Sequence, residues 1–188
     1  HKVFGEALAV LAGDGLLTAA FETAANAPAD PAVIVRAIRI LSEQAGELGM
    51  VGGQVLDTLY GISTEKELAG MYRLKTGVMI SGAAQLGCVA SNMNATMRQQ
   101  AAEYADQLGL AFQIRDDILD VTSTSEVLGK PVGSDAAEGK TTFVTLLGLE
   151  VAKTRAAALT AEAEQILSPF PQHEFLLDLT RELLCREK

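Results

Sequence analysis

Three aspartates lie close together in one predicted helix, at Asp116, Asp117 and Asp120. Residues three and four apart are neighbours on a helix surface, so Asp116 and Asp120 share one face and Asp117 lies beside them. Carboxylates this close repel one another unless a cation lies between them. Mg²⁺ suits such a cluster because it takes oxygen ligands and keeps positions for water and phosphate oxygens. The spacing therefore indicates a magnesium site, and the alternative is an exposed acidic helix face.

Other polar residues could complete such a site. Gln113 lies three residues before the first aspartate and extends the same polar stripe. Lys75 and Thr76 stand at the edge of the longest uncharged stretch of the chain, which indicates a partly buried lysine with an anionic partner. Lys130 and Lys140 each follow a glycine in a predicted loop directly after the aspartates. Such a loop can fold back and bring ammonium groups to phosphate oxygens. The alternative for Lys75 is an ordinary solvated lysine, and the alternative for the loop with Lys130 and Lys140 is a mobile surface loop without a ligand.

A further pair of polar residues follows two adjacent glycines. Gly52 and Gly53 stand in a helical context, where each costs about 1 kcal/mol relative to alanine. They therefore indicate a kink or a close backbone approach at this point. Gln54 and Asp57 lie one turn apart just beyond them and could face the aspartates. Two exposed polar residues on a tightly packed helix would give the same pattern.

The composition favours a mainly helical protein. The 188 residues include 48% apolar residues, five prolines and no tryptophan. The net charge of −9 argues against nucleic acid and anionic membranes as general partners. Cys88 and Cys185 are far apart, which predicts reduced thiols in a cytoplasmic protein. His1 and His173 fit neither a zinc protease nor a ferritin-like di-iron pattern.

Local signals divide the chain into helices. Asp30 and Pro31 are placed to begin one helix, and Thr64 to Glu67 form a capping box that begins another. The uncharged stretch 76–97 contains Gln and Asn residues, so we expect a buried core helix there and no membrane span. The apolar N-terminus predicts an internal helix, so we expect the chain to begin partway through a longer protein. The predicted helices cover residues 2–25, 31–48, 64–91, 95–123, 142–167 and 172 onward, with a further helical segment at 49–57.

Taken together, these segments resemble the trans-polyprenyl diphosphate synthases, the farnesyl and geranylgeranyl diphosphate synthase family, in its bacterial branch. The resemblance covers essentially all 188 residues. It is carried by the Gly-Gly-Gln-x-x-Asp segment that ends at Asp57, the Lys-Thr pair, the two glycine-preceded lysines, and the Gln-x-x-Asp-Asp-x-x-Asp core that ends at Asp120. The last of these motifs is highly specific in this company, whereas an isolated Asp-Asp-x-x-Asp would be weak.

The resemblance implies an all-α isoprenoid-synthase helical bundle around a central apolar cavity, with residues 1–188 as a single domain that lacks the N-terminal helices. It implies a homodimer that condenses isopentenyl diphosphate with an allylic diphosphate, such as dimethylallyl or geranyl diphosphate, to a short-chain product such as farnesyl diphosphate. Mg²⁺ would be held on the allylic diphosphate by the three aspartates. Lys75 and Lys130 would bind the same diphosphate, with Lys140 near it. Thr76 and Gln113 would lie beside the developing allylic cation, and Gln54 and Asp57 would line the site.

The chain departs from the family pattern in one respect. The first aspartate-rich motif is missing, and the 188 residues contain no second Asp-Asp pair. Half of a two-sided metal site is therefore present, and we expect negligible prenyltransferase activity from this chain alone. The alternative hypothesis is a non-catalytic helical subunit or binding protein of the same fold. A terpene cyclase is disfavoured because its Asn/Ser/Glu-type metal motif is absent.

Overall fold

The structure is a computed structural model that describes residues 1–123 and 139–185. Within these two ranges the regular secondary structure is helical and there is no strand, which confirms the predicted all-α class. The elements are α1 (Glu6–Ala25), α2 (Pro31–Ala45), α3 (Met50–Leu59), α4 (Glu65–Tyr72), the π-helical turn η1 (Arg73–Gly77), α5 (Val78–Ala90), α6 (Ala95–Thr122), α9 (Phe143–Leu147), α10 (Leu149–Leu167) and α11 (Glu174–Cys185).

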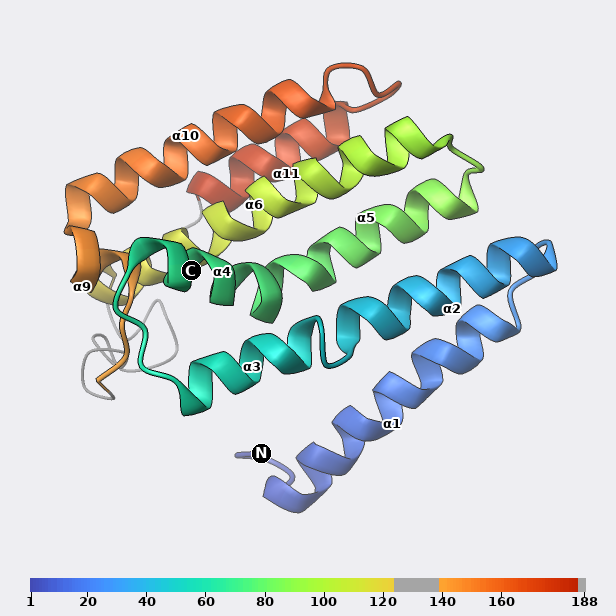
Figure 1. Ribbon diagram of the computed structural model, residues 1–188, viewed down its shortest axis with the longest axis horizontal. Helices are drawn as coiled ribbons and strands as arrows, with labels where there is room; N and C mark the ends of the chain where they lie inside the picture. Colours follow the sequence, from blue (N-terminus) through green and yellow to red (C-terminus); the bar gives the residue numbers. More distant parts are fainter. Residues whose placement is uncertain (124–138, 186–188) are drawn as a thin grey trace.

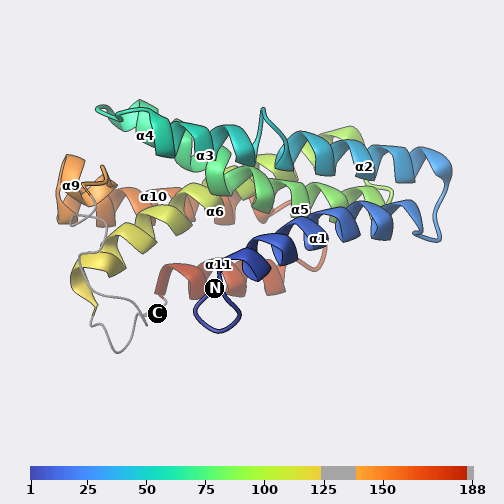
Figure 2. The same cartoon turned by 90° about the horizontal axis from the view of Figure 1, so that it is seen from below.

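The 28-residue helix α6 is the centre of the bundle (Figure 1). It packs between α5 and α10, and α11 lies beside α10 and also contacts α6. Helices α3 and α2 follow one another along the side of the α4–η1–α5 run (Figures 1 and 2). The buried residues of the two halves of α6 belong to two separate core clusters.

The C-terminal half of α6 packs in what we call the site-end cluster. That cluster joins α6 to α4, α9 and α10 through Leu68, Met71, Tyr72, Leu110, Ile114, Ile118, Phe143, Ala156 and Leu159. The N-terminal half of α6 packs in the far-end cluster. That cluster joins α6 to α5, α10 and the segment after α10 through Cys88, Ala101, Tyr104, Ala105, Leu108, Ala163, Leu167 and Phe170.

Capping residues explain where several helices begin. Thr64 Oγ1 accepts a hydrogen bond from Glu67 N at 3.2 Å, and Glu67 Oε2 accepts one from Thr64 N at 3.0 Å, so the predicted capping box is confirmed. Asn94 Oδ1 accepts from Met97 N at 2.9 Å at the start of α6. Asp30 precedes Pro31 as expected, but its side chain makes no capping bond. The proline, whose fixed φ suits the first helical turn, is therefore the local signal that begins α2.

Two long predicted helices are interrupted in the structure. The predicted helix 142–167 breaks into α9 and α10 at Gly148, which has φ +85°. A non-glycine residue rarely adopts this conformation, so the glycine ends α9. The predicted helix 64–91 keeps its path, but its middle widens into η1. The last helix begins at Glu174, two residues later than expected, because Gln172 has φ +53°.

Two glycines without side chains allow the backbones of α3 and α6 to pack closely against η1. A Cβ on Gly53 of α3 would overlap the backbone of Lys75, and a Cβ on Gly109 of α6 would lie 2.8 Å from the Gly77 Cα. The close backbone approach predicted from the glycine pair is thus confirmed at Gly53. π-helical turns inside α-helices often occur at functional sites, and Lys75 lies within η1. The position of η1 therefore favours a functional role for Lys75.

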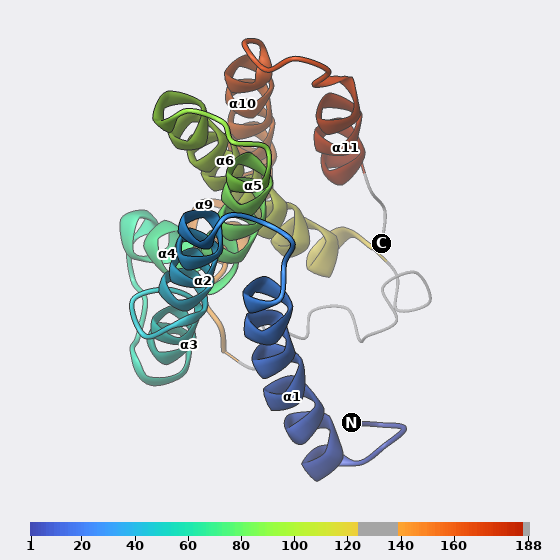
Figure 3. The same ribbon diagram turned by 90° about the vertical axis from the view of Figure 1, so that its right-hand side faces the viewer.

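Helix α1 differs from the rest because little covers it. It contacts α2 but leans away from the other helices (Figure 3), and none of its residues is buried. Its large apolar side chains Val10, Leu11 and Leu16 are 64%, 64% and 73% exposed. By length and composition α1 could cross a membrane, a test that buried core helices and signal sequences also pass. The expectation of no stable span therefore stays a prediction.

Candidate functional site

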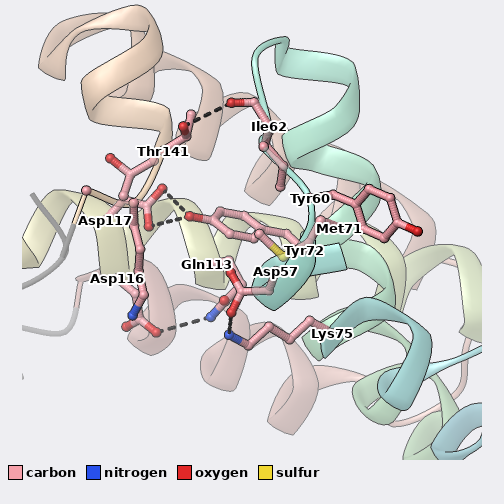
Figure 4. A pocket seen from close by; sticks show the side chains of 14 residues that line it. Asp57, Tyr60, Ile62, Met71, Tyr72, Lys75, Gln113, Asp116, Asp117 and Thr141 are labelled. Carbon is pink, nitrogen blue, oxygen red and sulfur yellow. Dashed lines mark hydrogen bonds and ion pairs between the residues drawn. The ribbon is translucent and has the colours of Figure 1, made fainter. Parts of the chain in front are cut away.

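A pocket of about 360 Å³ lies where the C-terminal half of α6 faces α4, η1 and the segment that leads into α9 (Figure 4). Most of the side chains around it are polar. The polar lining residues are Asp57, Tyr60, Tyr72, Lys75, Gln113, Asp116, Asp117, Lys140, Thr141 and Thr142. The hollow beside the aspartates is thus mainly polar, and the central apolar cavity implied by the resemblance stays a prediction.

Asp117 is a buried carboxylate of the pocket that accepts hydrogen bonds from two different elements. Its side chain is 5% exposed. The Tyr72 hydroxyl lies 2.8 Å from Asp117 Oδ1 and 2.9 Å from Oδ2 (Figure 4). The Phe143 backbone N–H also donates to Oδ2 at 2.8 Å. A buried carboxylate is costly unless it is hydrogen-bonded. These bonds offset that cost and join α6 to α4 and to the start of α9.

The other two aspartates lie differently. Asp116 lines the pocket, and its Oδ2 accepts a hydrogen bond from Gln113 Nε2 at 3.2 Å. Asp120 is 2% exposed and does not line the pocket. Over 1–123 and 139–185, no three His, Cys, Asp or Glu side chains are grouped closely enough to hold a metal ion. The structure therefore brings Asp116 and Asp117 to one pocket, and a site made of all three aspartates stays a prediction.

Lys75 has an anionic partner, as its place beside the uncharged stretch predicts. Its Nζ lies 2.6 Å from Asp57 Oδ2, and the two side chains are 33% and 16% exposed. Thr76, next along η1, is half-buried but is not a lining residue of the pocket. Gln54 is exposed on α3, donates to Thr58 Oγ1 at 3.0 Å and lies outside the pocket. Of these residues, the structure brings Lys75 and Asp57 to the aspartates.

The segment before α9 closes one side of the pocket. Lys140 lies at the pocket with an exposed side chain. Thr141 Oγ1 donates to the Ile62 carbonyl at 3.0 Å, which ties this segment to the turn before α4. Thr142 caps α9 by accepting from Thr145 N at 3.1 Å. Lys130, the other glycine-preceded lysine, lies outside the described residues.

Sequence reasoning missed Tyr72 and Thr141. Tyr72 lies three residues before Lys75, on nearly the same face of a helix, and a buried tyrosine hydroxyl usually finds a hydrogen-bond partner. That signal could have nominated Tyr72, but its partner Asp117 is 45 residues away. Thr141 carried only the weak signal of a hydroxyl beside a lysine.

The pocket's donor atoms fit magnesium. Mg²⁺ is often held by one or two carboxylates, with water and phosphate oxygens in its other positions. Asp116 and Asp117 offer four carboxylate oxygens at the pocket, and oxygen is the ligand atom that Mg²⁺ takes. Lys75 and Lys140 add the cationic groups that a diphosphate requires. The arrangement suits magnesium and a diphosphate together.

Known proteins are similar to this chain along most of its length. The sequence profile of the polyprenyl synthetase family matches residues 1–168. A farnesyl diphosphate synthase of Geobacillus stearothermophilus is 45% identical over 166 residues, which cover 84% of this chain and 54% of that protein. Geranylgeranyl pyrophosphate synthase 7 of Arabidopsis thaliana, a chloroplastic protein, is 40% identical over 176 residues, 90% of this chain and 51% of that one.

Solved structures agree in fold. The crystal structure of a Helicobacter pylori geranyltransferase complexed with magnesium and isoprenyl diphosphate matches with a TM-score of 0.81 and 35% identity, over 98% of this chain and 61% of that chain. The chain thus spans about half the length of the two sequence relatives described above. The match to the family profile over 1–168, with the shared helical fold, places the chain in the polyprenyl synthetase family.

Proposed function

We propose that this chain binds an allylic diphosphate with magnesium and so takes part in its condensation with isopentenyl diphosphate. The observation that carries the proposal is the pocket itself, which is lined by Asp116 and Asp117 of α6, by Lys75 of η1 and by Lys140. The printed description of the H. pylori structure, with magnesium and isoprenyl diphosphate bound, supports the same ligands here.

The acidic and basic residues have separate roles in this proposal. Asp116 and Asp117 hold the metal on the diphosphate, with Asp120 as the third aspartate of the motif. When bound, magnesium stabilises the negative charge that develops on the leaving diphosphate. Lys75, Lys130 and Lys140 donate hydrogen bonds to the phosphate oxygens. Such interactions accelerate the reaction because they strengthen as the carbon–oxygen bond breaks.

Uncharged polar side chains stabilise the carbon end of the allylic substrate, where positive charge develops. Gln113 and Thr76 steady the allylic cation through their oxygen atoms without attacking it, and Asp57 lines the site, whereas Gln54 lies outside the pocket. The double bond of isopentenyl diphosphate then attacks the cation, a new carbon–carbon bond forms, and a proton leaves to the departed pyrophosphate. By analogy with the family, the product is a short-chain isoprenoid diphosphate such as farnesyl diphosphate. We expect negligible condensation by the 188-residue chain alone.

Two further properties belong to the proposal. We propose a homodimer, because α1 exposes apolar side chains such as Val10 (64%) and Leu16 (73%) that association would cover. Sedimentation that gives the mass of one chain at all concentrations would contradict it. We also propose a cytoplasmic location, which agrees with the free, buried thiol of Cys88 and is tested by cell fractionation.

Calorimetry with geranyl diphosphate, with and without Mg²⁺, tests the central proposal. We expect binding that requires Mg²⁺ and that the substitution Asp116→Asn weakens strongly. Glu103→Gln is the control, because Glu103 is an exposed carboxylate on the same helix that does not line the pocket. Binding that ignores both Mg²⁺ and Asp116 would favour the alternative, a non-catalytic subunit or binding protein of this fold.

A further inference from the structure

We infer that Tyr72 is a positioning residue for Asp117, fixing the carboxylate in the orientation in which it would hold magnesium on the diphosphate. The inference rests on the proposed function of the pocket. It assigns a role to a tyrosine that stands outside the aspartate and lysine motifs.

The hydrogen bonds around Asp117 restrain its rotation. The Tyr72 hydroxyl is shared between the two carboxylate oxygens at 2.8 and 2.9 Å, and Phe143 N–H donates to Oδ2 at 2.8 Å. A hydrogen bond to a carboxylate is stronger than one between neutral groups. Two donors from different elements therefore fix both the position of the carboxylate and the plane of its oxygens.

The tyrosine is itself held firmly. Its ring is 7% exposed, belongs to the site-end cluster and lies 5.8 Å from the Phe143 ring, centroid to centroid. Tyr72 also directly precedes η1, the turn that carries Lys75. Tyr72 and Lys75 are thus three residues apart on the continuous α4–η1 segment, so this one segment carries a contact to the acidic side and a cation on the basic side of the pocket.

Removal of one hydroxyl tests the inference. Groups that orient a metal ligand typically contribute about 10- to 100-fold to metal affinity. We expect Tyr72→Phe to weaken the binding of Mg²⁺ with inorganic pyrophosphate by about 10- to 100-fold in calorimetry. The matched control is Tyr104→Phe, since Tyr104 is equally buried and its hydroxyl pairs with Thr180 Oγ1 at 2.9 Å in the far-end cluster. Equal affinities for the two variants would overturn the inference.

A second measurement needs no metal. Hydrogen exchange of the Phe143 amide reports whether Asp117 still accepts its bond. We expect Tyr72→Phe to speed that exchange about fivefold or more, and Tyr104→Phe to leave it unchanged relative to other amides. Unchanged Phe143 exchange in Tyr72→Phe would show that the hydroxyl does not hold Asp117. If the unaltered chain fails to bind magnesium pyrophosphate, the proposed function fails, and amide exchange alone then decides the role of Tyr72.

Discussion

The two halves of α6 bury polar groups in different ways. In the far-end cluster, the Tyr104 hydroxyl lies 2.9 Å from Thr180 Oγ1, and both groups are neutral. Burial raises the pKa of the Tyr104 hydroxyl, so this hydroxyl is uncharged at neutral pH. In the site-end cluster, the same helix buries Asp117 against Tyr72 and a backbone N–H.

The difference indicates which half carries function. A neutral hydroxyl pair is inexpensive to bury and joins α6 to α11. A buried carboxylate costs several kcal/mol in lost hydration before its hydrogen bonds offset that cost, so stability alone does not require one. We therefore expect substitutions at both ends to affect folding, and those at the site end to affect ligand binding as well.

The largest effects should come from the apolar residues that fix each end. Phe143 and Leu167 are 0% and 1% exposed. We expect Phe143→Ala to lower the free energy of unfolding by about 3–5 kcal/mol and Leu167→Ala by about 2–5 kcal/mol in urea titrations. Only Phe143→Ala should also abolish magnesium pyrophosphate binding while the variant is still folded by circular dichroism. Equal loss of binding in both would remove the distinction between the two ends.

The next effect concerns the glycine contact between α6 and η1. Gly109→Ala places a Cβ 2.8 Å from the Gly77 Cα, so the two backbones must separate. We expect a loss of about 1–3 kcal/mol of stability, together with weaker pyrophosphate binding as Lys75 moves. Gly87→Ala is the control, because nothing lies within 4 Å of the added Cβ on that exposed helical glycine. We expect Gly87→Ala to raise the free energy of unfolding by about 0.5–1 kcal/mol. A similar increase for Gly109→Ala would contradict the packing argument.

The comparison also shows what the sequence could predict. Helical periodicity and caps placed most helices, because those signals are local: the Thr64–Glu67 box and Asn94 begin α4 and α6 where expected. Local signals also nominated Lys75 and the aspartates. They failed where one residue changes the backbone, as at Gly148, whose positive φ divides α9 from α10.

Contacts between distant residues were beyond the same reasoning. The bond from Tyr72 to Asp117 spans 45 residues, and that from Thr141 to Ile62 spans 79. The exposed position of Gln54 likewise depends on how α3 packs on η1, where Gly53 meets the Lys75 backbone. Nothing in the local sequence sets the rotation of one helix against another, so the lining of the pocket required the structure.

A smaller effect on stability is expected from the Lys75–Asp57 pair. With side chains 33% and 16% exposed, the pair should contribute about 1 kcal/mol or less to folding. We expect Lys75→Gln to change thermal stability little but to weaken pyrophosphate binding in calorimetry clearly. Arg39→Gln, which breaks the exposed 2.7 Å pair with Glu43 on α2, should change neither quantity measurably. If Lys75→Gln binds as tightly as Arg39→Gln, the lysine does not face the ligand.

The smallest effect is the pH dependence of the Glu67 cap. Hydrogen bonds hold the pKa of Glu67 below its usual value. The largest contribution is from the Ser63 backbone N–H, and Thr64 contributes next. Because the folded pKa is the lower one, the stabilisation is fully present above the unfolded pKa of about 4.3 and is lost as the pH falls through the folded pKa. We expect the melting temperature of Glu67→Gln to lie slightly below that of the unaltered chain at neutral pH, and the gap to close in acid. Glu162→Gln, on the exposed side of α10, is the control for a general charge effect. A gap for Glu67→Gln that is constant across this pH range would show that the charge of the cap contributes nothing to α4.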